Sequence, residues 1–404
     1  MHRWLSALLV AWLAVGHAAI GPLPLTGRLS LLGSSGYARP GQLGYVSDDQ
    51  RTLTADQQTL RLMLEPSFGN HDLVFHGRLF RLHQQGYPPL AVAPSPFRWH
   101  ALADDWLAET GSDRDTRVGD ELDRLFYRYR GEAYSLTLGR QPIDWGSGRL
   151  WQPLNVFGAF SPTDLDTTFK PGIDALQLES YPSDFSSLAA VWVKAPAGSD
   201  ARDSGALHYR GQVGELSELT LVAASVNRQR MLGAGWDSSW HGMGWRVEAA
   251  GYDLRQHGRR PLFVIAGLDY RFDNGVLLTG EWYHNQAAAR HESELITVQR
   301  DAALPVGLRQ QLSRDVLGLA LDKDLSPLWH GGYLMLTSLL DNADNRSRLS
   351  QLHQFNLTYS VSNESELLLS LALGTGKGLD RYGRPQSEFG HLPVTFTVRW
   401  QLYF

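Results

Sequence analysis

Residues 394–404 read VTFTVRWQLYF, and apolar and polar side chains alternate along the whole segment. Valine, phenylalanine, tryptophan and leucine occupy the even positions from Val394 to Phe404, whereas threonine, arginine, glutamine and tyrosine occupy the odd positions. A period of two predicts a β-strand with one apolar and one polar face. The segment therefore indicates a sheet that separates an apolar environment from a polar one.

The same alternation recurs upstream with arginines on the polar face. In residues 122–130, Leu125, Tyr127 and Tyr129 alternate with arginines at 124, 128 and 130. A soluble β-sandwich would place these three guanidinium groups in its core, where unpaired charge is prohibitive. In a membrane barrel the faces are reversed, because lipid lies outside and water lies inside. The pattern therefore predicts a transmembrane β-barrel.

Marking every alternating segment predicts an all-β fold, a single antiparallel up-and-down β-barrel of about eighteen strands, with sixteen as the alternative. Short turns, such as 67–69, 182–184 and 241–243, should join the strands at one end. Long loops are expected at the other end, at 35–54, 84–120, 142–172, 287–312 and 374–392. The predicted strands are 25–34, 55–66, 70–83, 121–131, 132–141, 173–183, 185–194, 205–214, 217–226, 228–240, 244–254, 261–273, 275–286, 313–323, 328–339, 351–361, 364–373 and 393–404.

The N-terminal region and the composition set the cellular context. A short basic start, an apolar core from Trp4 to Val15 and the small residues around Ala18 predict a cleaved signal peptide at 1–18, which leaves the barrel at 19–404. The 404-residue chain contains no cysteine, which excludes a disulfide scaffold, a thiolate metal site and a cysteine nucleophile. No cofactor and no metal are expected. No nucleophile signature surrounds the 14 histidines, so an enzyme is not expected either.

Side chains on the polar strand faces would line the lumen. Basic groups outnumber acidic ones there, although the formal net charge of the chain is −5. Such a wall would favour anionic solutes. Alternatively, the arginines and acids pair across neighbouring strands and hold the wall together. The predicted pore-lining residues are Arg61, Arg78, Arg124, Arg128, Arg130, Arg246, Glu248, Asp269, Arg271, Glu281 and Arg399.

The connection 142–172 is the most unusual, beginning PIDWGSGRLWQPLNVF at 142–157. It is long and rich in proline, glycine and aromatic residues, and its apolar content argues against disorder. We therefore predict that it folds into the barrel as a constriction loop, with an external cap as the alternative. Two other segments carry weaker signals. Residues 99–109 fit either a short amphipathic helix or a plain loop. Residues 287–312 are expected to form a solvated outer loop. The predicted constriction residues are Asp144, Trp145, Arg149, Trp151, Asp164, Asp166 and Lys170.

Parts of the chain resemble known outer-membrane proteins. GRQ at 139–141 and KPGIDA at 170–175 resemble a block in porin-like β-barrels of Gram-negative bacteria, and the opening GRQ is distantly similar to alginate-export-type barrels of 18 strands. The terminal strand ending on Phe404 resembles the signature that the barrel-assembly machinery recognises. The resemblance implies residence in the cell outer membrane of a Gram-negative bacterium. An alginate exporter would have a strongly basic lumen, which Glu248 and Glu281 interrupt here.

These observations predict a porin-like channel for the passive passage of small hydrophilic solutes, with anions as a candidate class. The alternatives are an export or assembly barrel for a polysaccharide, and a barrel scaffold for a periplasmic or electron-transfer partner. Because the chain lacks cysteine, any haem would belong to that partner. Expected partners are outer-membrane lipid, lipopolysaccharide, the barrel-assembly machinery through Phe404, and small solutes, but no nucleic acid. The pattern leaves the oligomeric state open.

Overall fold

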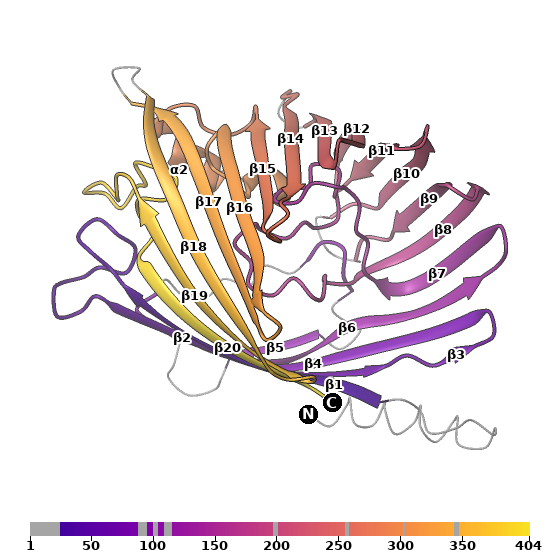
Figure 1. The fold of residues 1–404 in the computed structure, drawn as a ribbon, viewed down its shortest axis with the longest axis horizontal. Coiled ribbons are helices and arrows are strands. Elements are labelled where there is room, and N and C mark those ends of the chain that lie inside the picture. The colour runs from indigo at the N-terminus through magenta and orange to yellow at the C-terminus, as the bar shows by residue number, and fades with distance from the viewer. Residues whose placement is uncertain are drawn as a thin grey trace.

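The computed structural model describes residues 25–87, 95–99, 104–108, 115–196, 201–254, 258–301, 304–342 and 347–404. The predicted signal peptide lies outside these residues. In the described part of the chain, eighteen antiparallel strands follow one another around a closed barrel (Figure 1). These strands are β1 (Leu25–Tyr37), β2 (Thr52–Leu64), β4 (His71–Gln85), β6 (Thr116–Arg130), β7 (Tyr134–Gln141), β8 (Ile173–Ser183), β9 (Ser186–Val193), β10 (Ser204–Val213), β11 (Ser217–Val226), β12 (Gln229–Trp240), β13 (Met243–Asp253), β14 (Leu262–Arg271), β15 (Leu277–Asn285), β16 (Asp315–Ser326), β17 (Trp329–Asp341), β18 (Ser347–Ser362), β19 (Ser365–Thr375) and β20 (Val394–Tyr403).

The terminal segment closes the barrel. Strand β20 pairs with β19 on one side and with β1 on the other, so that Val398 lies opposite both Leu369 and Gly33. Arg399 points inward and is buried, whereas Phe396 and Phe404 are exposed on the outer face. The prediction of a barrel with one polar and one apolar face is confirmed, and the strand count is eighteen rather than sixteen.

The connections sort by length as predicted. Turns of a few residues, such as Asp184–Phe185 and His241–Gly242, join strands at one end, here called the short-turn end. The connections 38–51, 86–115, 142–172, 286–314 and 376–393 all leave the opposite end, here called the long-loop end. Outward positions between the two ends are mostly apolar, as at the exposed Leu31, Leu207 and Leu371, and a membrane barrel requires such an outer face.

The described part of loop 287–312 is solvated on one side only: Arg290, Glu294 and Arg300 are exposed, as expected for an outer loop, whereas its apolar side chains are buried against the wall. It contains η1 (Glu292–Glu294), α2 (Leu295–Arg300) and η2 (Val306–Arg309). Leu295 and Leu308 are fully buried among inward-facing side chains of the wall, including Phe263 and Tyr283. On β14 to β18 the inner face carries a cluster of apolar side chains near the long-loop end, so the apolar side of the loop packs against it.

The region 99–109 forms neither the short helix nor the plain loop that its sequence allows. Apart from Trp99, its described part is the strand β5 (Asp104–Ala108), which pairs with Arg117–Glu121 of β6. A second short strand, β3 (Ser67–Phe68), forms a hairpin with the start of β4. Strand β7 pairs only with the later part of β6, from Leu125 onward, so β5 occupies the edge of β6 beyond it. Among the described residues, no helix is long and apolar enough to cross a membrane.

The register gives a direct test of the outward face. Replacing Val398 with arginine should destabilise the folded barrel in lipid by about 2–4 kcal/mol, because a charge near the bilayer midplane loses its hydration. Thr358→Arg, at an inward position of β18, is the matched control and should cost less. Reversible urea unfolding in vesicles measures both. Equal folding free energies for Val398→Arg and the wild type would contradict the register.

Candidate functional site in the barrel lumen

Residues 142–172, here called the crossing loop, lie inside the ring of strands (Figure 1). Their first part is held by two carboxylates from the inner face of the wall. Glu248 on β13 accepts hydrogen bonds from the Ser147 amide, from the Gly148 amide at 3.1 Å and from the Leu154 amide at 3.4 Å. The Ser147 hydroxyl donates a further bond to it at 3.0 Å. A buried acid thus satisfies backbone donors that a buried loop would otherwise leave unpaired.

Glu281 on β15 serves the next residues in the same way. It accepts the amides of Arg149 at 3.0 Å, Leu150 at 3.2 Å and Trp151 at 2.8 Å. Glu248 and Glu281 are 0% and 2% exposed. Neither forms an ion pair with a described residue, so both carboxylates serve the loop backbone. They face the lumen as the alternation predicts, but they lie beneath the loop.

Aromatic packing fixes this part of the loop further. Trp151 is fully buried, with its ring centroid 5.1 Å from that of Tyr283. Trp145 stacks on His208 of β10, with ring centroids 4.9 Å apart and an interplanar angle of 9°. Leu154 packs against Gly233 and Gly235, where a larger side chain would collide with it. The two tryptophans are therefore anchors and not water-exposed pore residues.

The later part of the crossing loop binds the opposite wall. Asp166 accepts two hydrogen bonds from Arg28 of β1, at 3.1 and 2.7 Å. The Phe169 ring lies under the guanidinium carbons of Arg61 and Arg28, at 4.2 and 4.7 Å from its centroid, and 5.5 Å from that of Arg124. Cation–π attraction and a paired carboxylate thus hold this part against the arginines. The loop spans the lumen from one wall to the other.

The two ends of the crossing loop are bonded to each other. The other charged residues predicted for this loop lie in different environments. Lys170 bonds to Asp144, which also accepts a hydrogen bond from the Asn155 side-chain Nδ2 at 2.7 Å. Asp164 caps its own turn through the Ser161 amide, and the Arg149 side chain is 62% exposed. Burial raises the pKa of the Asp166 carboxyl, but the hydrogen bonds and charge of Arg28 outweigh it and hold that pKa below its usual range. Asp166 is therefore ionised at neutral pH.

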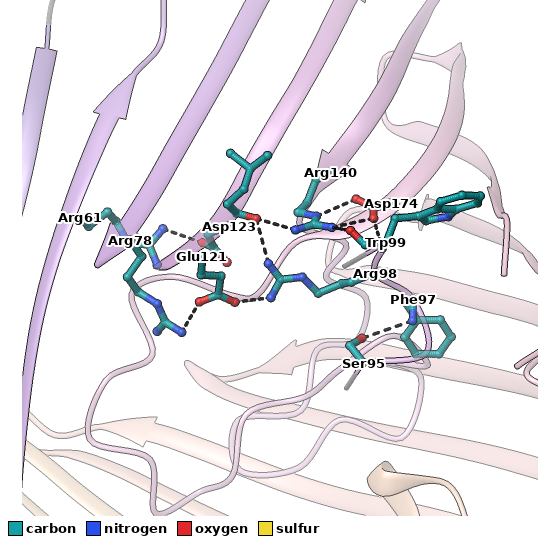
Figure 2. Close-up of polar contacts among 11 residues, drawn as sticks. Arg61, Arg78, Ser95, Phe97, Arg98, Trp99, Glu121, Asp123, Arg140 and Asp174 are labelled. Atoms are coloured by element: carbon teal, nitrogen blue, oxygen red, sulfur yellow. Dashed lines mark hydrogen bonds and ion pairs between the residues drawn. The ribbon is translucent and has the colours of Figure 1, made fainter. Parts of the chain in front are cut away.

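The inner face of β1, β2, β4 and β6 that carries Arg28, Arg61, Arg78 and Arg124 is here called the arginine wall. A second set of ion pairs supports it (Figure 2). Asp123 binds Arg61 at 2.5 Å, and Glu121 binds both Arg78 and Arg98. Arg98 donates to the Leu122 carbonyl at 2.9 Å. These contacts lie between β2, β4, β6 and the segment 95–99, so they fasten the connection between β4 and β6 to the wall.

Arg140 continues this network (Figure 2). It binds Asp174 through two bonds of 2.7 and 2.8 Å, and it donates to the Leu122 and Trp99 carbonyls at 2.8 and 2.9 Å. Arg140 is the last residue but one of β7 and Asp174 is the second residue of β8, so this pair closes the base of the crossing loop. The two ends of the porin-like sequence block thus meet in space.

Glu121, Asp123 and Phe169 are lumen residues that sequence reasoning missed. Alternation counted back from Arg124 puts Glu121 and Asp123 on the lipid face. In the structure the register shifts between His76 and Gly77 of β4, where Arg124 and Leu122 are the successive partners. Such a β-bulge reverses the alternation. Two acids on a lipid face would be costly, and this conflict is the signal that could have revealed the bulge.

The other predicted pore residues fall into three groups. Arg246 lies between Asp237 and Asp269, and Arg399 bonds to Glu366 and to the Leu165 carbonyl of the loop. Arg130 and Arg271 lie near the short-turn end, where Arg130 pairs with Asp72 and Arg271 donates to the Gly275 carbonyl. Arg124 and Arg128 have no carboxylate partner among the described residues.

A cavity of about 1330 Å³ lies under the first part of the crossing loop, toward the short-turn end. It is bounded by β8 to β14 and by loop residues 144–149 and 152. Its cations are Arg149, Arg210 and Arg246. They are outnumbered by the acids Glu132, Asp144, Glu179, Asp184, Glu215, Glu218, Asp237 and Asp269. An acidic chamber therefore faces the arginine wall across the crossing loop.

No family model and no curated relative matches the chain. Solved structures do match. Acinetobacter baumannii OccAB4 superposes with a TM-score of 0.59 and 9% identity, over 95% of this chain and 99% of that one. Pseudomonas aeruginosa OccD3 (OpdP) gives 0.55 and 11% over 96% and 92%, and the P. aeruginosa outer membrane protein opdK gives 0.55 and 10% over 94% and 99%. The chain therefore shares the barrel fold of the Occ proteins and of outer membrane protein opdK.

Proposed function

We propose that the chain is an outer-membrane channel through which small hydrophilic solutes diffuse passively, with anions favoured. The observation that carries this proposal is the crossing loop, which is bound to both walls by charged groups and divides a lumen lined by charge. A loop with this anchoring sets a size limit, and fixed arginines beside it bias the passage of ions. The mechanism involves no reaction.

Arg124 and Arg128 are the side chains best suited to attract an anion. Both face inward from β6, and neither has a carboxylate partner among the described residues. Arg124 also contacts Phe169 of the crossing loop. A solute anion passing the loop would thus meet two cations that form no ion pair with a described carboxylate.

The location follows from the same proposal. The barrel would sit in the outer membrane of a Gram-negative bacterium, with the short-turn end in the periplasm and lipopolysaccharide around the long-loop end. Residues 1–18 would direct export, and Phe404 would be read by the barrel-assembly machinery. The fold that this chain shares with the outer membrane protein opdK supports this location.

Selectivity measurements test the channel. In a planar bilayer under a salt gradient, the wild type should conduct with an anion-biased reversal potential. Arg124→Glu/Arg128→Glu should shift that potential toward cation selectivity, because it replaces two unpaired lumen cations with anions. Arg51→Glu, outside the lumen in loop 38–51, should leave it unchanged.

Two outcomes would contradict the proposal. If the double substitution left the reversal potential unchanged, ions would not pass these two arginines. A silent wild type would contradict passive diffusion and would favour the alternatives, an export or assembly barrel for a polysaccharide or a scaffold for a periplasmic or electron-transfer partner.

A further inference from the structure

Four exposed arginines gather at the long-loop end of β10 to β14: Arg202, Arg228, Arg230 and Arg260, here called the arginine rim. The Arg202 amide donates to the Asn227 side chain at 3.2 Å, which joins two neighbouring connections. Arg230 lies opposite Ser225 on one side and Asp253 on the other. Among the described residues, only Arg260 of the four has an ion-pair partner, Asp253 at 3.8 Å.

The backbone at Arg228 is unusual for an arginine. Asn227 and Arg228 form a two-residue hairpin turn with φ angles of 44° and 74°. The turn His241–Gly242 has nearly the same angles, 49° and 79°, and carries glycine at the second position. A non-glycine residue there costs about 1 kcal/mol. Strain of this kind concentrates at functional positions. An arginine at this strained position therefore indicates a role for the Arg228 guanidinium.

Next to the arginine rim, toward the short-turn end, the outer face of the barrel carries apolar and small side chains. The register places Trp192, Gly205, Ser225 and Arg230 in one row across β9 to β12. Between the tryptophan and the arginine, this row carries only the small residues Gly205 and Ser225. In the next row toward the short-turn end, Leu207 and Leu232 are 54% and 71% exposed and flank Ala223. A headgroup beside Arg230 could therefore continue into acyl chains lying against these leucines.

We propose that the arginine rim binds a phosphate of lipopolysaccharide, a phosphorylated and acylated glycolipid, in the leaflet at the long-loop end. Guanidinium groups match phosphate oxygens with paired hydrogen bonds, and apolar side chains below them match acyl chains. Strands β9 to β12 supply both. The inference rests on the proposed outer-membrane location, but it does not depend on conduction.

Native mass spectrometry of the full chain in detergent, titrated with diphosphorylated lipid A, tests the site. Arg228→Gly/Arg230→Ser should weaken lipid A binding by about tenfold or more, since it removes charge-assisted hydrogen bonds. Arg51→Ser removes an ion-paired arginine from the same end and should leave binding unchanged. Arg228→Gly alone should bind less lipid A yet unfold at no lower temperature, because glycine suits the turn.

Three results would overturn the site. These are equal affinity of the double variant and wild type, an equal loss in Arg51→Ser, and equal competition by phosphatidylglycerol, which would indicate general attraction of anions. Because the readout is lipid binding, a chain that fails to conduct still reports on this site.

Discussion

A chain carrying Glu248→Ala and Glu281→Ala should lose the fixed position of the crossing loop and should conduct far more in a planar bilayer. The two carboxylates together accept six backbone amides of residues 147–154. Each buried amide left without an acceptor costs about 1–3 kcal/mol. We expect the combined free-energy cost of six such amides to exceed the stabilisation that aromatic packing gives the loop. The first part of the loop should therefore leave the inner wall.

The control must separate loop release from loss of negative charge. Glu132→Ala/Glu179→Ala removes two carboxylates that line the acidic chamber under the first part of the crossing loop but make no described contact with the loop. It should change ion selectivity slightly and leave the size of the conductance unchanged. Glu248→Gln/Glu281→Gln keeps an acceptor oxygen at each position and should conduct between the wild type and the alanine variant. Equal conductance in the alanine variant and the wild type would show that the loop does not limit passage.

The second large effect concerns stability. Arg140→Leu should destabilise the barrel by about 3–5 kcal/mol, the usual cost of removing one partner of a buried ion pair. The Arg140 side chain is fully buried, and its loss leaves Asp174 without its guanidinium and the Leu122 and Trp99 carbonyls without this donor. The base of the crossing loop would then open. Urea unfolding in vesicles measures the change.

Matched variants make this prediction specific. Arg210→Leu breaks an ion pair with Glu218 whose side chains are 61% and 31% exposed, and it should cost less than about 1 kcal/mol. Arg140→Leu/Asp174→Leu removes both charges and should recover part of the stability. If Arg140→Leu unfolded at the same urea concentration as Arg210→Leu, the pair would not hold the loop base.

Strand identity and the inward or outward direction of side chains were largely predictable from the sequence. The segment 394–404 is the clearest case, because a period of two assigns every side chain to one face once the strand is recognised. Prediction of direction failed at Glu121 and Asp123, on the long-loop side of the bulge in β6. A bulge depends on how two strands pair, and that pairing is not written in either strand alone.

The candidate site was predictable only in outline. The apolar composition of 142–172 correctly directs attention to this loop, but nothing local indicates that Glu248 and Glu281 would receive its amides. Glu248 lies 94 to 101 residues and Glu281 lies 130 to 132 residues further along the chain than the amides they accept. The apolar inner face at Phe263 and Tyr283 was likewise invisible as a docking surface for 286–314, since alternation alone does not say which loop will cover an inward position.

Local sequence patterns suffice to predict a barrel of alternating strands with short turns at one end and long loops at the other. Period and turn chemistry are local properties, and lipid enforces them along every strand. How the lumen is filled follows from the folded arrangement alone: which acids hold the crossing loop, which arginines form no ion pair among the described residues, and which loops pack inside. Those outcomes depend on closure of the barrel by β1 and β20, which brings distant walls within reach of one loop.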